Sequence, residues 1–355
     1  MASNRSEPTS GRIATVDLSA FFVTPGRMID EAGRLQASRA LVDAMHDLGF
    51  VKLIGHGVLQ QEIDEALQWT KTLFDLPYED KMKAPHPPGP MPHRGYSGIG
   101  QEKVHTQEDI EALGTNDDVG KALRKITDFK ESYEIGSEHD LVQGNIWLPE
   151  GVLPRFRGYM TGLYQRLVGV SRVVLEAIGL GLALDDRARA ALMEMASDTN
   201  CQLRLLHYPC ITKEKLQSEL LTRLPPHNDW STMTLLLQDH HGGLELKDPK
   251  SQDFMHATPE EGSFVLNVGD MLQRFTNDYF ISALHRVSVP SPDVVPEAGL
   301  PARYSVPFFV APDFSHTIST LPQFVTTESP AKYEPVRFGD YGSIATKYQY
   351  QSSEM

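Results

Sequence analysis

The stretch LPPHNDWSTMTLLLQD, residues 224–239, begins with polar residues and then becomes apolar. Its second half has the composition of a buried β-strand, and His227 and Asp229 stand before it, separated by one residue. Residues i and i+2 of a strand point to the same face, so these two side chains can converge on one ion. Burying both is costly unless something pairs with them. In a chain with 13 histidines such a pair also arises by chance, so a surface turn is the alternative.

Two further segments supply the groups that a metal site needs. TNDYFISALHRV places His285 in an expected strand, after a predicted hairpin turn at Asn277–Asp278. PARYSVPFF places Arg303 and Ser305 on one strand face, where a forked guanidinium and a hydroxyl suit a carboxylate. Two imidazoles and one carboxylate that leave coordination positions open are typical of non-haem Fe(II) oxygenases.

Composition narrows the class of protein. The chain has 355 residues, 40% of them hydrophobic, so it can bury a large core. Its 33 Lys and Arg against 47 Asp and Glu give a net charge of −14, which argues against nucleic-acid binding by general electrostatics. Cys201 and Cys210 are too few for a disulfide framework and fit a reducing compartment. With no signal-peptide core and no long apolar run, we expect a cytoplasmic protein without a membrane partner.

The pattern of apolar residues along the sequence changes near residue 200. Helical spacing of apolar residues occurs over 38–49, 60–77 and 153–184. Beyond residue 200, short apolar runs alternate with Gly, Asn, Asp and Pro, which is typical of an antiparallel sandwich or jelly roll. We therefore expect a mainly β protein with helices, in which a double-stranded β-helix (jelly-roll) core is flanked by an N-terminal helical region. The expected divisions are a disordered tail over 1–11, an N-terminal non-haem dioxygenase region over 12–150 and a helix plus jelly-roll core over 151–355.

Ordered motifs along nearly the whole chain resemble the Fe(II)/2-oxoglutarate-dependent dioxygenases of the isopenicillin N synthase-like superfamily. The N-terminal half carries IATVDLS, LGFVKLIGHGV, LFDLPYEDKMK, HRGYSGIGQE and DFKESYEIG, and the C-terminal half carries LRLLHYP, HNDWSTMTLLLQD, NVGDMLQRFTNDYFISALHRV and RYSVPFF. Three departures affect local turns or spacing: Gly55 replaces the usual Asn before His56, Asn277–Asp278 stands where Asn-Gly is common, and a Pro-rich insert occupies 290–301.

The resemblance implies a reaction and a metal. Its Fe(II) ligands would be His227, Asp229 and His285, with 2-oxoglutarate and O₂ as cosubstrates. The implied activity is oxidation of a small, partly apolar metabolite, by hydroxylation, desaturation or oxidative rearrangement, and specialised metabolite biosynthesis is the expected context. No residue beyond the metal centre is expected to act as a catalytic acid or base.

The resemblance also implies the cosubstrate contacts. Arg303 and Ser305 match the Arg-x-Ser that holds the distal carboxylate of 2-oxoglutarate. Tyr208, in the sequence HYPC, matches a family tyrosine that donates a hydrogen bond to the same molecule.

Four residues are candidates for substrate contacts. Arg204 shares a strand face with Tyr208, and pairing with a nearby acid is its alternative role. Phe309 shares the face of the Arg-x-Ser pair, and a place in the core is its alternative. The segment HRGYSGIGQE is expected to cover the site, so Tyr96 and Gln101 are further candidates, with a purely structural loop as the alternative.

Other classes of function remain open at this point. A Fe(II)-dependent oxidase of the same superfamily would not use 2-oxoglutarate, although isopenicillin N synthase and the plant ethylene-forming oxidase also have an Arg-x-Ser. A metal-binding scaffold on the same fold and a zinc hydrolase are further alternatives, and the hydrolase would leave the Arg-x-Ser unexplained. Succinate release and ferrous binding separate these classes, whereas substrate identity and oligomeric state are not readable from the sequence.

Overall fold

The computed structural model describes residues 13–22, 28–89, 93–102, 129–218, 223–290 and 295–346, so the expected tail over 1–11 lies outside the described residues. The strands are β1 (Thr15–Asp17), β2 (Phe50–Ile54), β3 (Gly95–Ser97), β4 (Glu131–Ile135), β5 (Gln202–Tyr208), β6 (Leu224–His227), β7 (Met233–Gln238), β8 (Leu244–Lys247), β9 (Phe254–His256), β10 (Phe264–Val268), β11 (His285–Val287), β12 (Arg303–Val310), β13 (Thr317–Ile318) and β14 (Val336–Arg337). The helices are α1 (Glu31–Asp47), α2 (Gln60–Phe74), α3 (Tyr78–Lys81), α6 (Phe156–Gly181), α7 (Asp186–Met193), α8 (Lys213–Ser218), α9 (Asp270–Phe275) and α10 (Phe338–Thr346).

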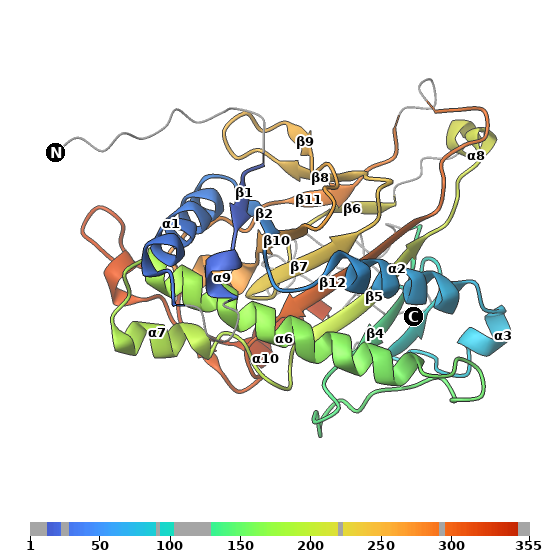
Figure 1. The fold of residues 1–355 in the computed structure, drawn as a ribbon, viewed down its shortest axis with the longest axis horizontal. Helices are drawn as coiled ribbons and strands as arrows, with labels where there is room; N and C mark the ends of the chain where they lie inside the picture. Colours follow the sequence, from blue (N-terminus) through green and yellow to red (C-terminus); the bar gives the residue numbers. More distant parts are fainter. Residues whose placement is uncertain are drawn as a thin grey trace.

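Two sheets form the centre of the molecule (Figure 1). The major sheet has the strand order β1-β2-β10-β7-β12-β5-β4-β3, and the minor sheet has the order β6-β11-β8-β9. Strands of the N-terminal half join the major sheet, because β2 pairs with β10 and β4 pairs with β5, both antiparallel. The predicted jelly-roll core with flanking helices is confirmed.

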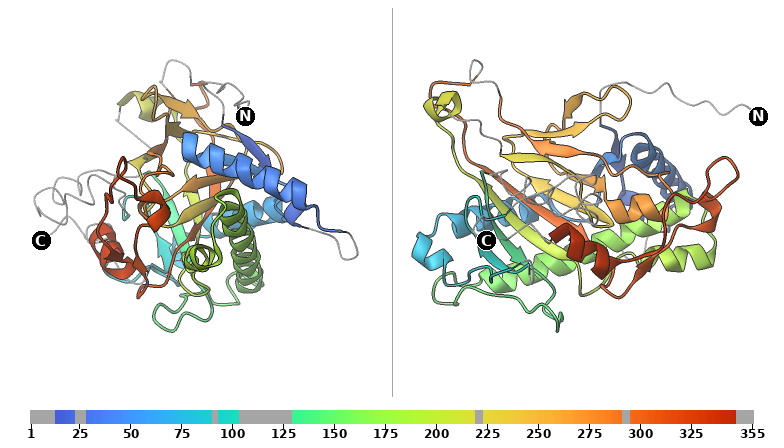
Figure 2. Two further views of the ribbon diagram at one scale, coloured as in Figure 1. Left: turned by 90° about the vertical axis from the view of Figure 1, so that its left-hand side faces the viewer. Right: turned by 180° about the vertical axis from the view of Figure 1, so that it is seen from behind.

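Helix α6 packs against one face of the major sheet. On β12, Val306, Phe308 and Val310 belong to the hydrophobic core, and the ring of Phe308 lies 5.3 Å from that of Tyr164 on α6. The residues between them point the other way because strand side chains alternate. Figure 2 shows α10 on the face of the sheet turned away from α1 and α6. The alternation of side chains along this strand thus places Val306, Phe308 and Val310 in the core and Ser305, Pro307 and Phe309 on the opposite face.

Helix α1 has clear start and stop signals. The carboxylate of Asp30 accepts a hydrogen bond from the Gly33 N–H at 2.9 Å, which caps the first turn. At the other end Gly49 has a φ of +68°, and a Cβ there would lie 2.0 Å from the carbonyl oxygen of Ile281. Glycine is therefore required where the chain leaves α1 and enters β2.

The predicted hairpin turn at Asn277–Asp278 is wrong. The preceding segment is helix α9, and the two residues follow it with φ values of +52° and +65°. Asn and Asp tolerate this left-handed conformation at helix ends as well as in hairpins, so the dipeptide alone did not distinguish them. The Asn277 side chain donates to the carbonyl of Phe324 at 3.0 Å and accepts from the Lys332 N–H at 3.0 Å.

A core substitution tests this architecture. Leu235 lies on the central strand β7, is 0% exposed and stands between Leu266 and Phe308 of the neighbouring strands. Leu235→Ala is expected to lower the free energy of unfolding by about 2–5 kcal/mol, because a buried cavity replaces the side chain. Urea denaturation measures the loss, and Leu141→Ala, at a side chain that is 98% exposed, is the matched control. A loss equal to that of the control would contradict the placement of β7.

Among the described residues, no helix combines the length and apolar character needed to cross a membrane.

Candidate metal centre and cavity

Three side chains meet at one point, two from strands of the minor sheet and one from the loop that follows β6. His227 ends β6 and His285 begins β11, and the two residues face each other across the strand pair. Asp229 lies in the loop after β6, not on the strand as expected, yet its Oδ1 is 3.9 Å from Nε2 of His227 and 3.8 Å from Nε2 of His285. One ligand atom from each of the three residues lies within 4.8 Å of the others. This spacing fits a single metal ion.

Backbone carbonyls orient both imidazoles. Nδ1 of His227 is 3.0 Å from the carbonyl oxygen of Pro225, and Nδ1 of His285 is 3.0 Å from that of Ala283. With Nδ1 donating its proton to a carbonyl, Nε2 carries the free lone pair. Both lone pairs are then directed toward the carboxylate of Asp229.

The carboxylate of Asp229 is held through its second oxygen. Oδ2 accepts hydrogen bonds from Oγ1 of Thr234 at 2.6 Å and from Nδ2 of Asn267 at 2.7 Å. Burial opposes ionisation, but His285, His227 and these two hydrogen bonds together lower the pKa of Asp229. Burial, followed by the neighbouring His285, lowers the pKa of His227 to about 3. Near neutral pH a carboxylate and a neutral His227 imidazole therefore face one another, the protonation states that metal binding requires.

A cavity between the two sheets contains this cluster. Its floor is formed by alternate residues of the neighbouring strands β5 and β12, namely Gln202, Arg204, Leu206, Tyr208, Arg303, Ser305, Pro307 and Phe309. In the register of these strands Arg303 stands opposite Tyr208, and Phe309 stands opposite Gln202. The predicted residues of the Arg-x-Ser pair, Tyr208, Arg204 and Phe309 therefore share one floor, with Arg303 at one end and Phe309 at the other.

At the first end, Arg303 is buried without an acidic partner. It is 1% exposed and donates from Nε to the carbonyl of Gly242 at 2.7 Å, from Nη1 to Ser305 Oγ at 3.1 Å and from Nη2 to Gln238 Oε1 at 3.0 Å. Its guanidinium carbon lies 5.0 Å from the ring of Tyr208. Within the described ranges no carboxylate forms an ion pair with it. A buried cation without a counter-charge is costly, so this end is suited to an anionic ligand.

At the other end, the cations are compensated. Nη1 of Arg204 is 2.6 Å from Glu102 Oε1, and its Nε is 3.0 Å from Glu134 Oε1. Lys130, which also lines the cavity, donates to the second oxygen of Glu102. The guanidinium of Arg204 lies 5.3 Å from the ring of Phe309. Two of the four predicted substrate residues, Arg204 and Phe309, thus line the cavity, and Arg204 also forms the ion pairs considered as its alternative role.

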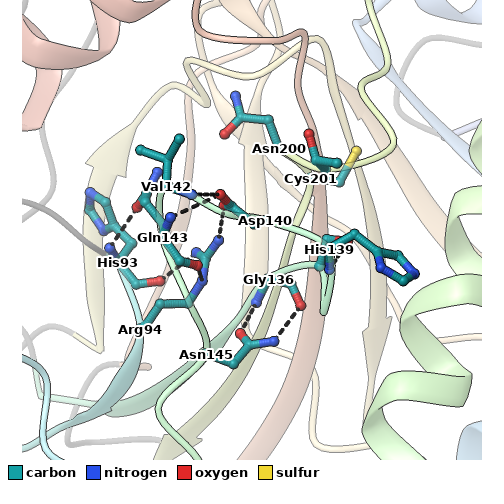
Figure 3. A network of polar contacts seen from close by, with 12 residues as sticks. His93, Arg94, Gly136, His139, Asp140, Val142, Gln143, Asn145, Asn200 and Cys201 are labelled. Atoms are coloured by element: carbon teal, nitrogen blue, oxygen red, sulfur yellow. Dashed lines mark hydrogen bonds and ion pairs between the residues drawn. The ribbon is translucent and has the colours of Figure 1, made fainter.

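Loop residues complete the wall of this end, and Figure 3 shows their contacts. Arg94 donates to Asp140 Oδ2 at 3.0 Å, to the carbonyl of Gln143 at 3.1 Å and to the carbonyl of His93 at 2.7 Å. The side-chain oxygen of Gln143 accepts from the His93 N–H at 3.1 Å. These residues were not among the candidates expected from the sequence, because they belong to irregular segments in which no periodicity indicates where a side chain points.

The structure does not bring Tyr96 and Gln101 to the cavity. The hydroxyl of Tyr96, on β3, donates to Glu131 Oε2 at 2.5 Å, and Gln101 Oε1 accepts from the Gly98 N–H at 2.7 Å within its own turn. Neither is among the described residues that line the cavity. Their expected placement assumed that the whole segment covers the site, whereas β3 joins the edge of the major sheet.

Comparison with known proteins assigns the family. Residues 13–150 match the family model of the N-terminal region of non-haem dioxygenase in morphine synthesis, and residues 199–312 match that of the 2OG-Fe(II) oxygenase superfamily. The chain is 36% identical to a 2-oxoglutarate-Fe(II) type oxidoreductase of Metarhizium rileyi, over 89% of this chain and 86% of the relative. It is 35% identical to a proline hydroxylase of Petromyces alliaceus, over 89% of this chain and 91% of the relative.

Solved structures agree with these relatives. A Neurospora crassa protein crystallised with alpha-KG (2-oxoglutarate) superposes with a TM-score of 0.78 at 30% identity, covering 93% of this chain and 94% of that one. A second structure of the same protein, which also contains thymine, gives a TM-score of 0.78 at 31% identity and covers 93% of this chain and 95% of that one.

The chain therefore belongs to the 2OG-Fe(II) oxygenase superfamily. It is a 2-oxoglutarate-dependent dioxygenase with Fe(II) as its cofactor and 2-oxoglutarate and O₂ as cosubstrates. The predicted family, enzyme class and cofactors are confirmed. An oxidase that does not use 2-oxoglutarate is not favoured by these relatives, and the scaffold and zinc hydrolase alternatives are set aside for the same reason.

Proposed function

We propose that His227, Asp229 and His285 hold the Fe(II) ion. Support comes from the two Nε2 atoms and the Asp229 Oδ1 that approach one point, with every second polar atom of these side chains bonded elsewhere. A carboxylate and two imidazoles suit Fe(II) and leave positions for further ligands. When bound, the iron supplies O₂ activation coupled to oxidative decarboxylation of 2-oxoglutarate.

The distal carboxylate of 2-oxoglutarate is proposed to bind Arg303, with Ser305 and Tyr208 completing the site. The observation that carries this assignment is the buried guanidinium of Arg303, which has no acidic partner among the described residues. Its three hydrogen bonds fix the plane of the guanidinium, and two of its five N–H groups are left for a carboxylate. Binding there positions the cosubstrate and neutralises the buried charge.

The substrate is proposed to be a small, partly apolar metabolite of specialised metabolism, oxidised at a C–H bond. Arg204 and Phe309 are its proposed contacts, since both line the end of the cavity away from Arg303. A proline hydroxylase among the relatives and thymine in a related structure support a small substrate. The positions of Tyr96 and Gln101 give no support for substrate contact. A cytoplasmic location stays part of the proposal, supported by the free thiols of Cys201 and Cys210.

The division of the chain is also proposed. An N-terminal region over 12–150 and a core over 151–355 follow the two family matches, although strands of both regions share the major sheet.

Anaerobic titration tests the proposed site. Purified chain is mixed with Fe(II), then with 2-oxoglutarate, and the visible absorption that the chelated ferrous ion gives is recorded. One equivalent of each is expected to saturate the signal, and admission of O₂ is expected to release succinate. A chain that binds no Fe(II), or that consumes O₂ with a metabolite and releases no succinate, would refute the proposal.

A change next to the proposed ligands gives a graded effect. Thr234→Val removes one of the two hydrogen bonds that hold Asp229 Oδ2 and keeps the shape of the side chain. Fe(II) affinity is expected to fall by about 10–100-fold, because partners of metal ligands orient them and tune their basicity. Competition with a ferrous chelator measures the change, and Thr326→Val on an exposed turn is the control. Equal affinities in the two variants would count against the role of Asp229.

A further inference from the structure

Strand β5 carries a polar side chain at the far end of the cavity that the proposed function does not use. Gln202 and Tyr208 are the first and last residues of this seven-residue strand, which spans about 20 Å. Both side chains line the same cavity floor. Gln202 therefore lies well away from Arg303 and beside Phe309, its partner across the strand pair.

The amide nitrogen of Gln202 lacks a hydrogen-bond acceptor. It is buried, and none of the described residues accepts a hydrogen bond from it. Leaving a buried N–H donor without an acceptor is unfavourable, because the donor has lost its water and gained nothing in return. A donor in a ligand cavity is satisfied when a ligand supplies an oxygen, so Gln202 points to an acceptor on the substrate.

Among the residues that the structure describes, the charges around this donor offset one another. Arg204 and Lys130 carry two positive charges, and Glu102 and Glu134, which contact them, carry two negative charges when ionised. The two carboxylates do not line the cavity, so the substrate meets the cations' N–H groups, but their charge is already compensated. This differs from Arg303, whose charge no described carboxylate compensates. The far end therefore offers hydrogen-bond donors without demanding a negative charge.

A flat apolar surface lies beside these donors. The ring of Phe309 lies under the guanidinium of Arg204, and Leu206 and Pro307 continue the same floor. A planar group is the shape that an aromatic face accommodates best. Donors at the edge of such a surface suit a carbonyl oxygen that lies in the plane of the bound group.

We propose that Gln202, Arg204 and Phe309 form an amide site, in which an uncharged, planar carbonyl group of the substrate accepts a hydrogen bond from Gln202. The site would make the enzyme prefer an amide, lactam or imide to the corresponding carboxylate. This inference deepens the proposed function and rests on it only for the place of 2-oxoglutarate at the other end of the cavity.

A matched pair of probes tests the amide site. Benzamide and benzoate have the same ring and nearly the same shape, but only benzoate is charged. Their dissociation constants are measured by ligand-observed NMR with Fe(II) and saturating 2-oxoglutarate, without O₂. Burial raises the pKa of Glu134 to about 7, so the measurement is made at pH 8, where this carboxyl is ionised. Benzamide is expected to bind at least about tenfold more tightly than benzoate.

Two variants distinguish the effect of the Gln202 hydrogen-bond donor from the effect of the charges around it. Gln202→Met keeps the length of the side chain and is expected to weaken benzamide about tenfold, because one hydrogen bond in a buried site is lost. Glu134→Gln leaves one positive charge in excess and is expected to strengthen benzoate about tenfold. Gln68→Met, at an exposed position of α2, is the control for both.

The outcomes distinguish the two levels of inference. If the unmodified chain does not bind 2-oxoglutarate, the proposed function is refuted. With that binding intact, the amide site is refuted if benzoate binds as well as benzamide, if benzamide shows no binding, or if Gln202→Met leaves its affinity unchanged. Because 2-oxoglutarate affinity reports on the fold of every variant, a misfolded variant is recognised and Gln202→Asn, which shortens the donor, then takes its place.

Discussion

Replacing His227 with alanine is expected to abolish succinate release. The remaining Asp229 and His285 would offer two ligand atoms where three now converge. Changes in residues that only orient metal ligands cost about 10–100-fold, so removal of a ligand itself is expected to exceed about 100-fold. Asp229→Ala and His285→Ala are expected to behave alike, because each removes one member of the same set.

Two measurements on each variant separate metal loss from general damage. Bound iron per chain is determined after anaerobic loading, and succinate is measured after O₂ is admitted. His256→Ala is the matched control, since this histidine on β9 also faces a carboxylate, Glu245, but has a side chain that is 72% exposed. A His227→Ala chain that keeps its iron and its turnover would show that the metal is held elsewhere.

The strand-borne part of the site was predictable from the sequence because strands have a fixed period of two. Once β5 and β12 were expected as strands, parity alone placed Arg204 with Tyr208 and Arg303 with Ser305 and Phe309. The structure puts all five on one cavity floor. Parity predicts which face a side chain lies on but not what it binds, so the roles of these residues in binding stay proposals.

The loop-borne part was predictable only in part, for a physical reason. Asp229 was expected as a ligand, but on a strand, whereas it reaches the two histidines by a turn after β6. Arg94, which was not expected at the site, reaches the cavity through carbonyls and a carboxylate of loop residues. Such positions depend on long-range contacts that no local pattern encodes. The same limit explains the error at Asn277–Asp278, whose left-handed conformation suits both a hairpin and a helix end.

Ion pairs between carboxylates and cations that are distant in the chain were also not predictable from the sequence. Arg204 was recognised as facing a site, yet its neutralisation by Glu102 and Glu134 requires β4 to pair with β5 and the segment before residue 103 to approach. This pairing changes the chemistry inferred for the cavity, because an uncompensated arginine attracts an anion whereas a compensated one only donates hydrogen bonds. The contrast between Arg204 and Arg303 thus comes from the fold and not from residue type.

Arg303→Leu is expected to raise the KM for 2-oxoglutarate by about 30-fold or more. Truncating one partner of a buried, hydrogen-bonded charge pair costs about 2–5 kcal/mol, and about 1.4 kcal/mol corresponds to a factor of ten. Arg303→Lys keeps the charge but loses the fork that contacts Gly242 and Gln238, so an intermediate effect is expected. Arg337→Leu removes a surface arginine paired with Asp340 and is the control.

A second 2-oxo acid shows whether the effect of Arg303 is specific for a carboxylate. 2-Oxovalerate keeps the oxo acid that chelates a metal but ends in a methyl group, so it has nothing for a guanidinium to bind. The native chain is expected to prefer 2-oxoglutarate strongly, and Arg303→Leu is expected to reduce that preference by the same factor by which it raises the KM. Damage to the fold would weaken the binding of both oxo acids alike and leave the ratio of their KM values unchanged. That result would show that Arg303 does not bind the cosubstrate. A much smaller ratio of KM values, with Fe(II) binding unchanged, would instead show that the buried charge of Arg303 binds the distal carboxylate of 2-oxoglutarate.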